Sequence, residues 1–370
     1  MRLVPALALC LGLLAVPEHG FAATAAVQPA TGPGGQDYAE REVVKRAIGP
    51  AGRQTFVFHG AAEGAEKRPV VVFLHAWGAT NPAIYGGWIE HLARKGAVVL
   101  FPRFQEVNRT RPAAAMENMT AALTEAFAQL EGDTRARADT SRVAVVGHLS
   151  GAPMAANYVA KAQGAGLPVP RLVFAVTPGG IATDAKSRGI LLGDLAAIPE
   201  TTLLATLIGD REHLPSDRAA RRLHRESTSV PANRKIFMRV LSDDHGFPPL
   251  SATLASPGSL NDAYDAAKIP LPPEPPRDPK APRPRQERWS AEMALSGEQT
   301  ILVAQLNQSV TDALDGWGFW KTLDFAMTAA FSGSDFASLR RDGAFFEMGR
   351  WSDGWPVKRL GAEAQREQPR

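Results

Sequence analysis

The chain has 370 residues, of which 45% are hydrophobic and 21% are charged. These proportions are ordinary for a globular protein and exclude collagen-like, disordered and multi-span membrane classes for most of the chain. The 41 basic and 38 acidic residues nearly balance, with a formal net charge of +3. We therefore expect no nucleic-acid partner, because binding to a polyanion depends on a strong excess of positive charge.

Residues 1–25 have the three parts of a secretory signal peptide. Arg2 precedes an apolar run, LVPALALCLGLLAV (3–16), and small-residue cleavage sites follow at GFA (20–22) and ATA (23–25). The run is too short for a spanning helix, so we expect an exported protein, periplasmic or secreted, with no stable membrane span after cleavage. The only cysteine, Cys10, lies inside this segment. The mature chain is therefore expected to form no disulfide.

Seven short apolar runs predict the strands of a mostly parallel sheet. Their nearly continuous apolarity is typical of strands covered on both faces, and they span 54–60, 69–75, 97–103, 142–148, 171–178, 202–209 and 235–242. Helical patterns lie between them at 84–96, 113–132, 150–164 and 216–227. The alternation predicts a doubly wound, three-layer α/β domain over 54–268, preceded by an N-terminal tail over 26–53.

The last quarter of the chain differs in composition. The stretch IPLPPEPPRDPKAPRPR (269–285) holds too many prolines for a helix or a central strand. We therefore expect a loop or linker over 269–288. Beyond it, 291–316 has a helical pattern, and the remainder of 289–370 is rich in Trp and Phe. Because one helix and these aromatics make a thin core by themselves, we expect this extension to dock on the main domain.

Four predicted strand ends carry the motifs from which a site is expected. Ligands of open α/β sheets bind beyond the carboxyl ends of the strands. The motifs there are HAWG (75–78), GHLSG (147–151), GDRE (209–212) and SDDHGF (242–247). Their order is that of an oxyanion loop, a nucleophile turn, an acid and a histidine, which is the chain order of the α/β-hydrolase triad.

In these motifs the chain resembles the α/β-hydrolase superfamily, most of all its dienelactone-hydrolase-related and polyester-hydrolase-like secreted groups, over roughly 55–250. The resemblance implies an α/β-hydrolase fold and a small-molecule or polymeric ester-like ligand. It implies an oxyanion hole made by the backbone N–H groups of Trp77 and Ser150, with Glu212 as the acid and His245 as the general base.

The sequence offers a second candidate acid and has no metal or phosphate motif. Asp210 is an alternative to Glu212 as the acid, and the sequence does not rank the two. The histidines lack metal-ligand spacing, and no phosphate-binding G-x-x-x-x-G-K-[ST] motif is present, so we expect no metal and no cofactor.

The chain departs from the family pattern at the nucleophile, where Leu149 stands in place of serine. A leucine side chain has no atom that a general base can activate. Loss of the nucleophile of a serine hydrolase lowers kcat about 10⁶-fold. The sequence therefore predicts a protein whose ester hydrolysis is lost or severely impaired, and whose binding pocket is kept.

Ser150, one residue later, leaves an alternative open. At the start of a helix its side chain turns by about 100° from that of Leu149, so we expect its Oγ to miss His245. We expect this hydroxyl to be a helix N-cap or N1 hydroxyl instead. The alternative is an active carboxylic-ester hydrolase that uses Ser150, or another unrecognised nucleophile, with His245 and Glu212 or Asp210. A distance of about 3.2 Å or less between Ser150 Oγ and His245 Nε2 would favour that alternative.

Overall fold

One twisted sheet organises the part of the chain that the structure, a computed structural model, describes: residues 22–184, 186–211, 214–273, 290–295 and 299–363. Its nine strands follow the order β1-β2-β4-β3-β5-β6-β7-β8-β9. Pairing is parallel from β4 through β3 to β8, whereas β1, β2 and β9 are antiparallel to their neighbours. The strands are β1 (Val43–Ile48), β2 (Thr55–Gly60), β3 (Arg68–Leu74), β4 (Val98–Pro102), β5 (Ala138–His148), β6 (Leu172–Val176), β7 (Leu203–Gly209), β8 (Lys235–Val240) and β9 (Gly361–Ala362).

The seven predicted strands are present, and two further strands were missed. β1 lies inside the segment expected to be an N-terminal tail, and β9 lies near the C-terminus. β1 is an edge strand whose first five residues are only partly buried. Its sequence, VVKRAI, therefore lacks the continuous apolarity by which the central strands were recognised.

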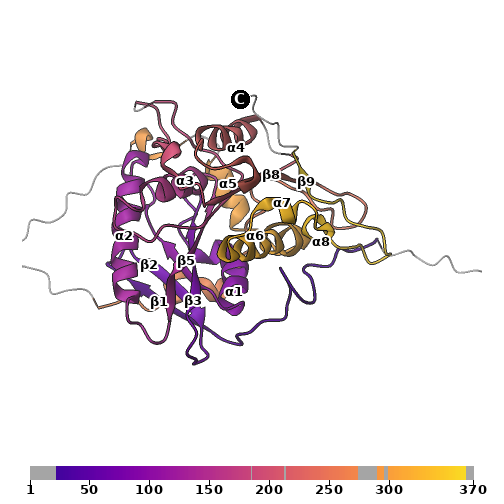
Figure 1. Cartoon of the computed structure of the whole chain (residues 1–370), viewed down its shortest axis with the longest axis horizontal. Helices are drawn as coiled ribbons and strands as arrows, with labels where there is room; N and C mark the ends of the chain where they lie inside the picture. Colours follow the sequence, from indigo (N-terminus) through magenta and orange to yellow (C-terminus); the bar gives the residue numbers. More distant parts are fainter. Residues whose placement is uncertain (1–21, 185, 212–213, 274–289, 296–298, 364–370) are drawn as a thin grey trace, which may run out of the picture.

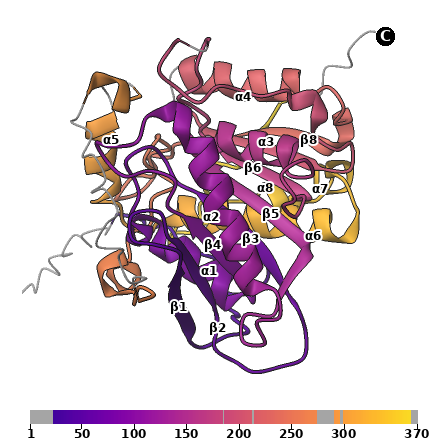
Figure 2. The same cartoon turned by 90° about the vertical axis from the view of Figure 1, so that its left-hand side faces the viewer.

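Helices cover both faces of the sheet, which makes three layers (Figures 1 and 2). Trp88 of α1 packs on one face with the C-terminal helices. Phe127 of α2 and Tyr158 of α3 pack on the other. The helices are α1 (Gly86–Arg94), α2 (Ala115–Leu130), α3 (Gly151–Lys161), α4 (Leu214–Glu226), α5 (Gln299–Leu306), α6 (Lys321–Ser332), α7 (Phe336–Leu339) and α8 (Gly343–Phe346).

The expectation of one continuous helix over 291–316 is wrong. The structure has a 3₁₀ turn at Ala291–Met293, the short helix α5, and a π-helical segment at Leu314–Trp320 that runs directly into α6. A new helix starts there because the side chain of Asp312 accepts a hydrogen bond from the backbone N–H of Leu314 (2.7 Å). Of the proline-rich stretch, residues 274–289 lie outside the described residues.

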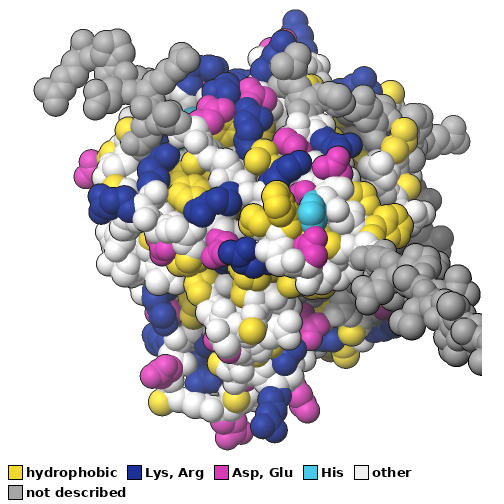
Figure 3. All heavy atoms as spheres, turned by 90° about the vertical axis from the view of Figure 1, so that its right-hand side faces the viewer, with side chains coloured by type: hydrophobic (Ala, Val, Ile, Leu, Met, Phe, Trp, Pro, Cys, Tyr) yellow, Lys and Arg dark blue, Asp and Glu magenta, His cyan; other side chains and the backbone are white. Residues whose placement is uncertain are grey.

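The C-terminal extension shares its core with the sheet. Leu306, Phe319 and Leu323 belong to the same buried cluster as Phe73 and Phe174 of the central strands. On the surface opposite α2, basic and acidic side chains lie next to one another (Figure 3).

The start of the described chain packs on the C-terminal extension. Residues 1–21, most of the expected signal peptide, lie outside the described residues. Ala25 forms a β-bridge with Trp351, and the carbonyl of Ala23 accepts a hydrogen bond from the N–H of Phe247 (2.8 Å). In the described parts of the chain, no helix is both long enough and apolar enough to cross a membrane.

The π-helical segment holds a buried carboxyl group, that of Asp315, which is 1% exposed. Its Oδ2 accepts the backbone N–H of Asp312 (2.9 Å), whereas Oδ1 has no hydrogen-bond partner. Burial raises the pKa of Asp315 well above its usual value of 3.8, and the nearby Asp312 carboxylate adds to this rise. An unpaired buried charge is unfavourable, so the protonated form is favoured.

We predict that Asp315→Asn stabilises the protein at neutral pH. Above pH 3.8 the unfolded chain releases this proton while the folded chain retains it, so the group destabilises the fold increasingly as pH rises towards its folded pKa. An amide of the same shape removes this effect, and we expect Tm to rise by about 1–4 °C at pH 7 to 8, with less gain at pH 4. Thermal unfolding across this pH range measures it. The exposed Glu63→Gln is the control, and an equal or negative shift for Asp315→Asn would contradict the prediction.

Candidate functional site

A tight turn joins β5 to α3, with only Leu149 and Ser150 between the strand and the helix. Leu149 has a φ of +50°, in the left-handed region that residues with a side chain rarely adopt. Its N–H donates to the carbonyl of Val176 at the end of β6 (3.0 Å), and its carbonyl accepts from Ala152 (3.0 Å) and Gly179 (3.2 Å). These bonds hold Leu149 at the tip of a strained strand-to-helix turn, the geometry of a nucleophile elbow.

Two glycines permit this turn because the backbones approach too closely for a side chain. A Cβ on Gly147 would lie 2.2 Å from the carbonyl oxygen of Gly151, and one on Gly151 would lie 2.1 Å from that of Leu74. The start of α3 is therefore in direct contact with the end of β3. The motif GHLSG thus specifies the turn even though its central residue is leucine.

The side chain of Leu149 is partly buried and packs against the core cluster on the α1 face of the sheet. Its Cδ2 lies 3.1 Å from the point that a Cβ of Gly179 would occupy. Hydrocarbon therefore fills the space at the tip of the turn.

Ser150 occupies the N-cap position of α3, as expected, but its hydroxyl does not cap the helix. Its Oγ is buried and has no hydrogen-bond partner among the described residues. In particular it is not within hydrogen-bond distance of His245 Nε2. Among the described residues, Ser150 thus has no base within hydrogen-bond distance that could activate it as a substitute nucleophile.

The loop after β3 places Trp77 beside the elbow, since β3 and β5 are neighbours in the sheet. The indole Nε1 of Trp77 donates to the carbonyl of Met293 (3.0 Å). Leu295 is buried, and its Cδ1 lies 3.0 Å from the Cβ point of Gly180, whose other near neighbour is Ser150 Cβ at 3.5 Å. Residues 290–295, which we call the cover segment, therefore lie over the elbow.

His148, next to the tip, is a structural residue. Its Nδ1 accepts from the hydroxyl of Tyr85 (2.8 Å) and its Nε2 donates to the carbonyl of Leu254 (2.8 Å). Tyr85 in turn accepts the N–H of Ala76 (3.2 Å), so the network links the loop after β3 to the elbow. Burial lowers the pKa of His148 to about 4, which keeps the imidazole neutral at physiological pH.

Of the two acids predicted after β7, only Asp210 is among the described residues, and its described hydrogen bond is not to His245. Asp210 is exposed, and its Oδ1 accepts a hydrogen bond from Ser242 Oγ (2.6 Å), just beyond the end of β8. Ser242 Oγ also accepts the N–H of Ala252 (3.0 Å). Glu212, the other candidate acid, lies outside the described residues.

His245 is held by the C-terminal extension instead. Its Nε2 bonds Asp353 Oδ2 (2.7 Å), and its ring stacks on that of Trp355 with centroids 5.5 Å apart. The hydrogen bonds from the Trp355 N–H and from His245 lower the pKa of Asp353, so its carboxylate is ionised and can orient the imidazole. A second ring, that of Trp351, lies 5.7 Å away.

The structure thus brings some predicted residues together and leaves others apart. Trp77, Leu149 and Ser150 lie at adjacent strand ends, whereas His245 bonds a residue 108 positions further along the chain. Sequence reasoning missed Ser242 and Asp353 as the partners of Asp210 and His245. The only signal for them was their place in the motifs SDDHGF and WSDGW. Among the described residues, no group of three or more His, Cys, Asp or Glu side chains is placed to hold a metal ion.

The comparisons with known proteins agree with this geometry at the level of the fold. A protein family described as alpha/beta hydrolase fold matches residues 71–225, less than half of the chain. That stretch includes the loop after β3 and the elbow, and with the strand order it gives the chain an α/β-hydrolase fold. No curated protein matches the chain.

Similar solved structures are esterases of low sequence identity. A fungal esterase of Rhizomucor miehei is 14% identical, with 55% of this chain and 76% of that chain covered and a TM-score of 0.43. Carboxyl esterase 2 of Tuber melanosporum is 17% identical, with 56% and 78% covered and a TM-score of 0.42. An esterase of Pyrobaculum calidifontis is 13% identical, with 55% and 77% covered and a TM-score of 0.43.

We predict that Leu149→Ser alone does not create an esterase. The substitution supplies a hydroxyl at the tip of the turn, but the side-chain contacts of His245 among the described residues are with Asp353, Trp351 and Trp355 of the C-terminal extension, so no base is placed beside that hydroxyl. Hydrolysis of p-nitrophenyl acetate by this variant should equal that of Leu149→Ala, which opens the same space without a nucleophile. A turnover about 10³-fold above Leu149→Ala that disappears in the double variant with His245→Ala would show that His245 does reach the elbow.

Proposed function

We propose that this chain is an exported α/β-hydrolase-fold protein that has lost the hydrolysis of carboxylic esters. The observation that carries the proposal is Leu149, a hydrocarbon side chain at the positive-φ tip of the elbow. An acyl transfer there has neither an attacking atom nor space for a tetrahedral intermediate.

Two further features support a loss that extends beyond one residue. The cover segment lies over the elbow through the bond from Trp77 to Met293. The expected base, His245, pairs with Asp353 on the C-terminal extension. A single back-substitution leaves both of these in place.

The remaining polar groups suit binding better than chemistry. The backbone N–H groups of Trp77 and Ser150 donate to no acceptor among the described residues. Such amides can hold the carbonyl oxygen of a small or polymeric ester-like ligand without cleaving it. A ligand of this kind would have to displace Leu295 from beside the turn, because Leu295 is buried there.

An active esterase that uses Ser150 is the less favoured alternative. It requires a base within about 3.2 Å of Ser150 Oγ. In the part of the chain that the structure describes, the buried hydroxyl has no hydrogen-bond partner, and His148, one residue before the tip, already uses both ring nitrogens. The alternative therefore needs a rearrangement of the turn.

We predict that the native protein hydrolyses p-nitrophenyl acetate and butyrate no faster than its own Ser150→Ala and His245→Ala variants. Loss of a nucleophile lowers kcat about 10⁶-fold, and what remains from binding does not depend on these two side chains. Initial rates at pH 7 to 8 measure this. Turnover that falls at least about 100-fold in either variant would establish Ser150 or His245 as catalytic.

Export is the second part of the proposal, and it rests on the signal-peptide pattern of residues 1–25. Of the two cleavage sites in the sequence, the contacts of Ala23 and Ala25 support the one after Ala22. Cleavage after Ala25 would remove the β-bridge to Trp351 and the acceptor for the N–H of Phe247.

We therefore expect the protein, expressed in full in a Gram-negative host, to appear in the periplasm with Ala23 as its first residue. N-terminal sequencing or intact mass measures this. A mature chain that begins at Ala26 would contradict the packing argument, and an uncleaved cytoplasmic chain would contradict export.

A further inference from the structure

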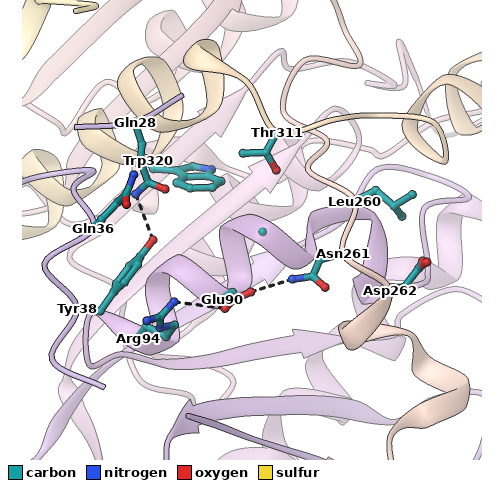
Figure 4. Close-up of a pocket in the computed structure, with 11 residues that line it drawn as sticks. Gln28, Gln36, Tyr38, Glu90, Arg94, Leu260, Asn261, Asp262, Thr311 and Trp320 are labelled. Carbon is teal, nitrogen blue, oxygen red and sulfur yellow. Dashed lines mark hydrogen bonds and ion pairs between the residues drawn. The ribbon is translucent and has the colours of Figure 1, made fainter. Parts of the chain in front are cut away.

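A polar cavity of about 520 Å³ lies on the outer side of α1, between this helix, the segment after residue 27 and the turn at 260–262 (Figure 4). Its volume is within the range of small-molecule sites. None of the residues that line it belongs to the elbow or to the cover segment. The cavity is therefore distinct from the candidate site at the elbow.

The floor of the cavity is one face of α1. Gly87, Glu90 and Arg94 line it and follow helical spacing, whereas Trp88 of the same helix is buried in the core. Figure 4 shows Glu90 between Arg94 and Asn261. Glu90 is 3.5 Å from the guanidinium of Arg94, and its other oxygen accepts the amide N–H of Asn261 (2.8 Å). These charges offset each other, so the floor offers hydrogen-bonding groups with little net charge.

The walls add two groups that are free to bind. The side-chain amide of Gln36 and the carboxylate of Asp262 line the cavity from opposite sides and are exposed. Neither side chain has a hydrogen bond or an ion pair with another described residue. Tyr38 and Trp320 also line the cavity, and the guanidinium of Arg94 lies over the Tyr38 ring, 4.0 Å from its centroid.

The cavity is held in shape by bonds behind it. Asp324 of α6 accepts the backbone N–H of Gly34 (2.7 Å) and lies 3.0 Å from His91 Nε2 on α1. The ring of His91 stacks on that of Trp320 at 5.0 Å. The N-terminal segment, α1 and α6 are thus tied together, and a ligand would find the cavity already formed.

We propose that this cavity binds a neutral polyhydroxylated ligand, a mono- or disaccharide. A hydroxyl group both donates and accepts, so it can bond the amides of Gln36 and Asn261 as well as a carboxylate. The unpaired Asp262 carboxylate repels anions, and the polar lining disfavours hydrocarbon ligands, whose burial would leave these groups without partners. The proposal goes beyond ester chemistry and does not depend on Leu149.

Calorimetric titration of the full mature chain tests this with four neutral sugars, glucose, N-acetylglucosamine, maltose and cellobiose, and with citrate as an anionic probe. We expect at least one sugar to bind with a Kd of about 1 mM or tighter and citrate not to bind. Each sugar is taken to about 10 mM, so that such a site would be largely filled.

Variants locate the binding. Gln36→Ala and Asp262→Ala should each weaken it about tenfold, since each removes hydrogen bonds from an exposed side chain without disturbing the core. Gln129→Ala, an exposed amide on α2, is the matched control and should not change the affinity. Leu149→Ser should not change it either, which separates this test from that of the elbow.

Three results would overturn the proposal. They are the absence of binding by all four sugars, binding of citrate in preference to the sugars, and sugar binding that neither Gln36→Ala nor Asp262→Ala weakens. None of them bears on ester hydrolysis, so the two proposals stand or fall separately.

Discussion

The close approach of α3 to β3 and β5 is the constraint on which the site depends. There is no space for a side chain at Gly147 or Gly151, because each would collide with a backbone carbonyl at about 2 Å. Only two residues therefore connect the strand to the helix, and the first must adopt a positive φ. The turn presents whatever side chain stands at position 149. Here that side chain is leucine, so the tip of the turn presents hydrocarbon.

Among the described residues, the polar side chains that follow β7 and β8 do not form the predicted pair of acid and base. Asp210 bonds Ser242 rather than a histidine, and His245 bonds Asp353 of the C-terminal extension. The cover segment, which belongs to the same extension, accepts a hydrogen bond from Trp77. The C-terminal extension thus contributes to the core and also contacts the loop after β3 beside the elbow. These separate contacts act together, which is why a single substitution at Leu149 should not restore chemistry.

The sequence predicted the features that depend on local pattern. Continuous apolarity predicts the buried central strands, and two glycines at a fixed spacing predict the elbow. What was missed depends on distant contacts. β1 pairs at the edge of the sheet. The expected helix over 291–316 is not continuous, and a new helix begins where Asp312 accepts the N–H of Leu314. His245 bonds Asp353, which is 108 residues further along the chain. Gln36 and Asp262 share a cavity although no motif links them.

The most direct measurement of whether the elbow can attack an electrophile is the intact mass of the native protein after exposure to excess fluorophosphonate. This reagent reports any serine that a neighbouring base activates, whatever the natural ligand is. We expect the mass to stay unchanged, and equal to that of Ser150→Ala treated in the same way. The addition of one phosphonyl group to the native chain, mapped to Ser150 and absent from Ser150→Ala, would contradict the loss of hydrolysis proposed for this protein.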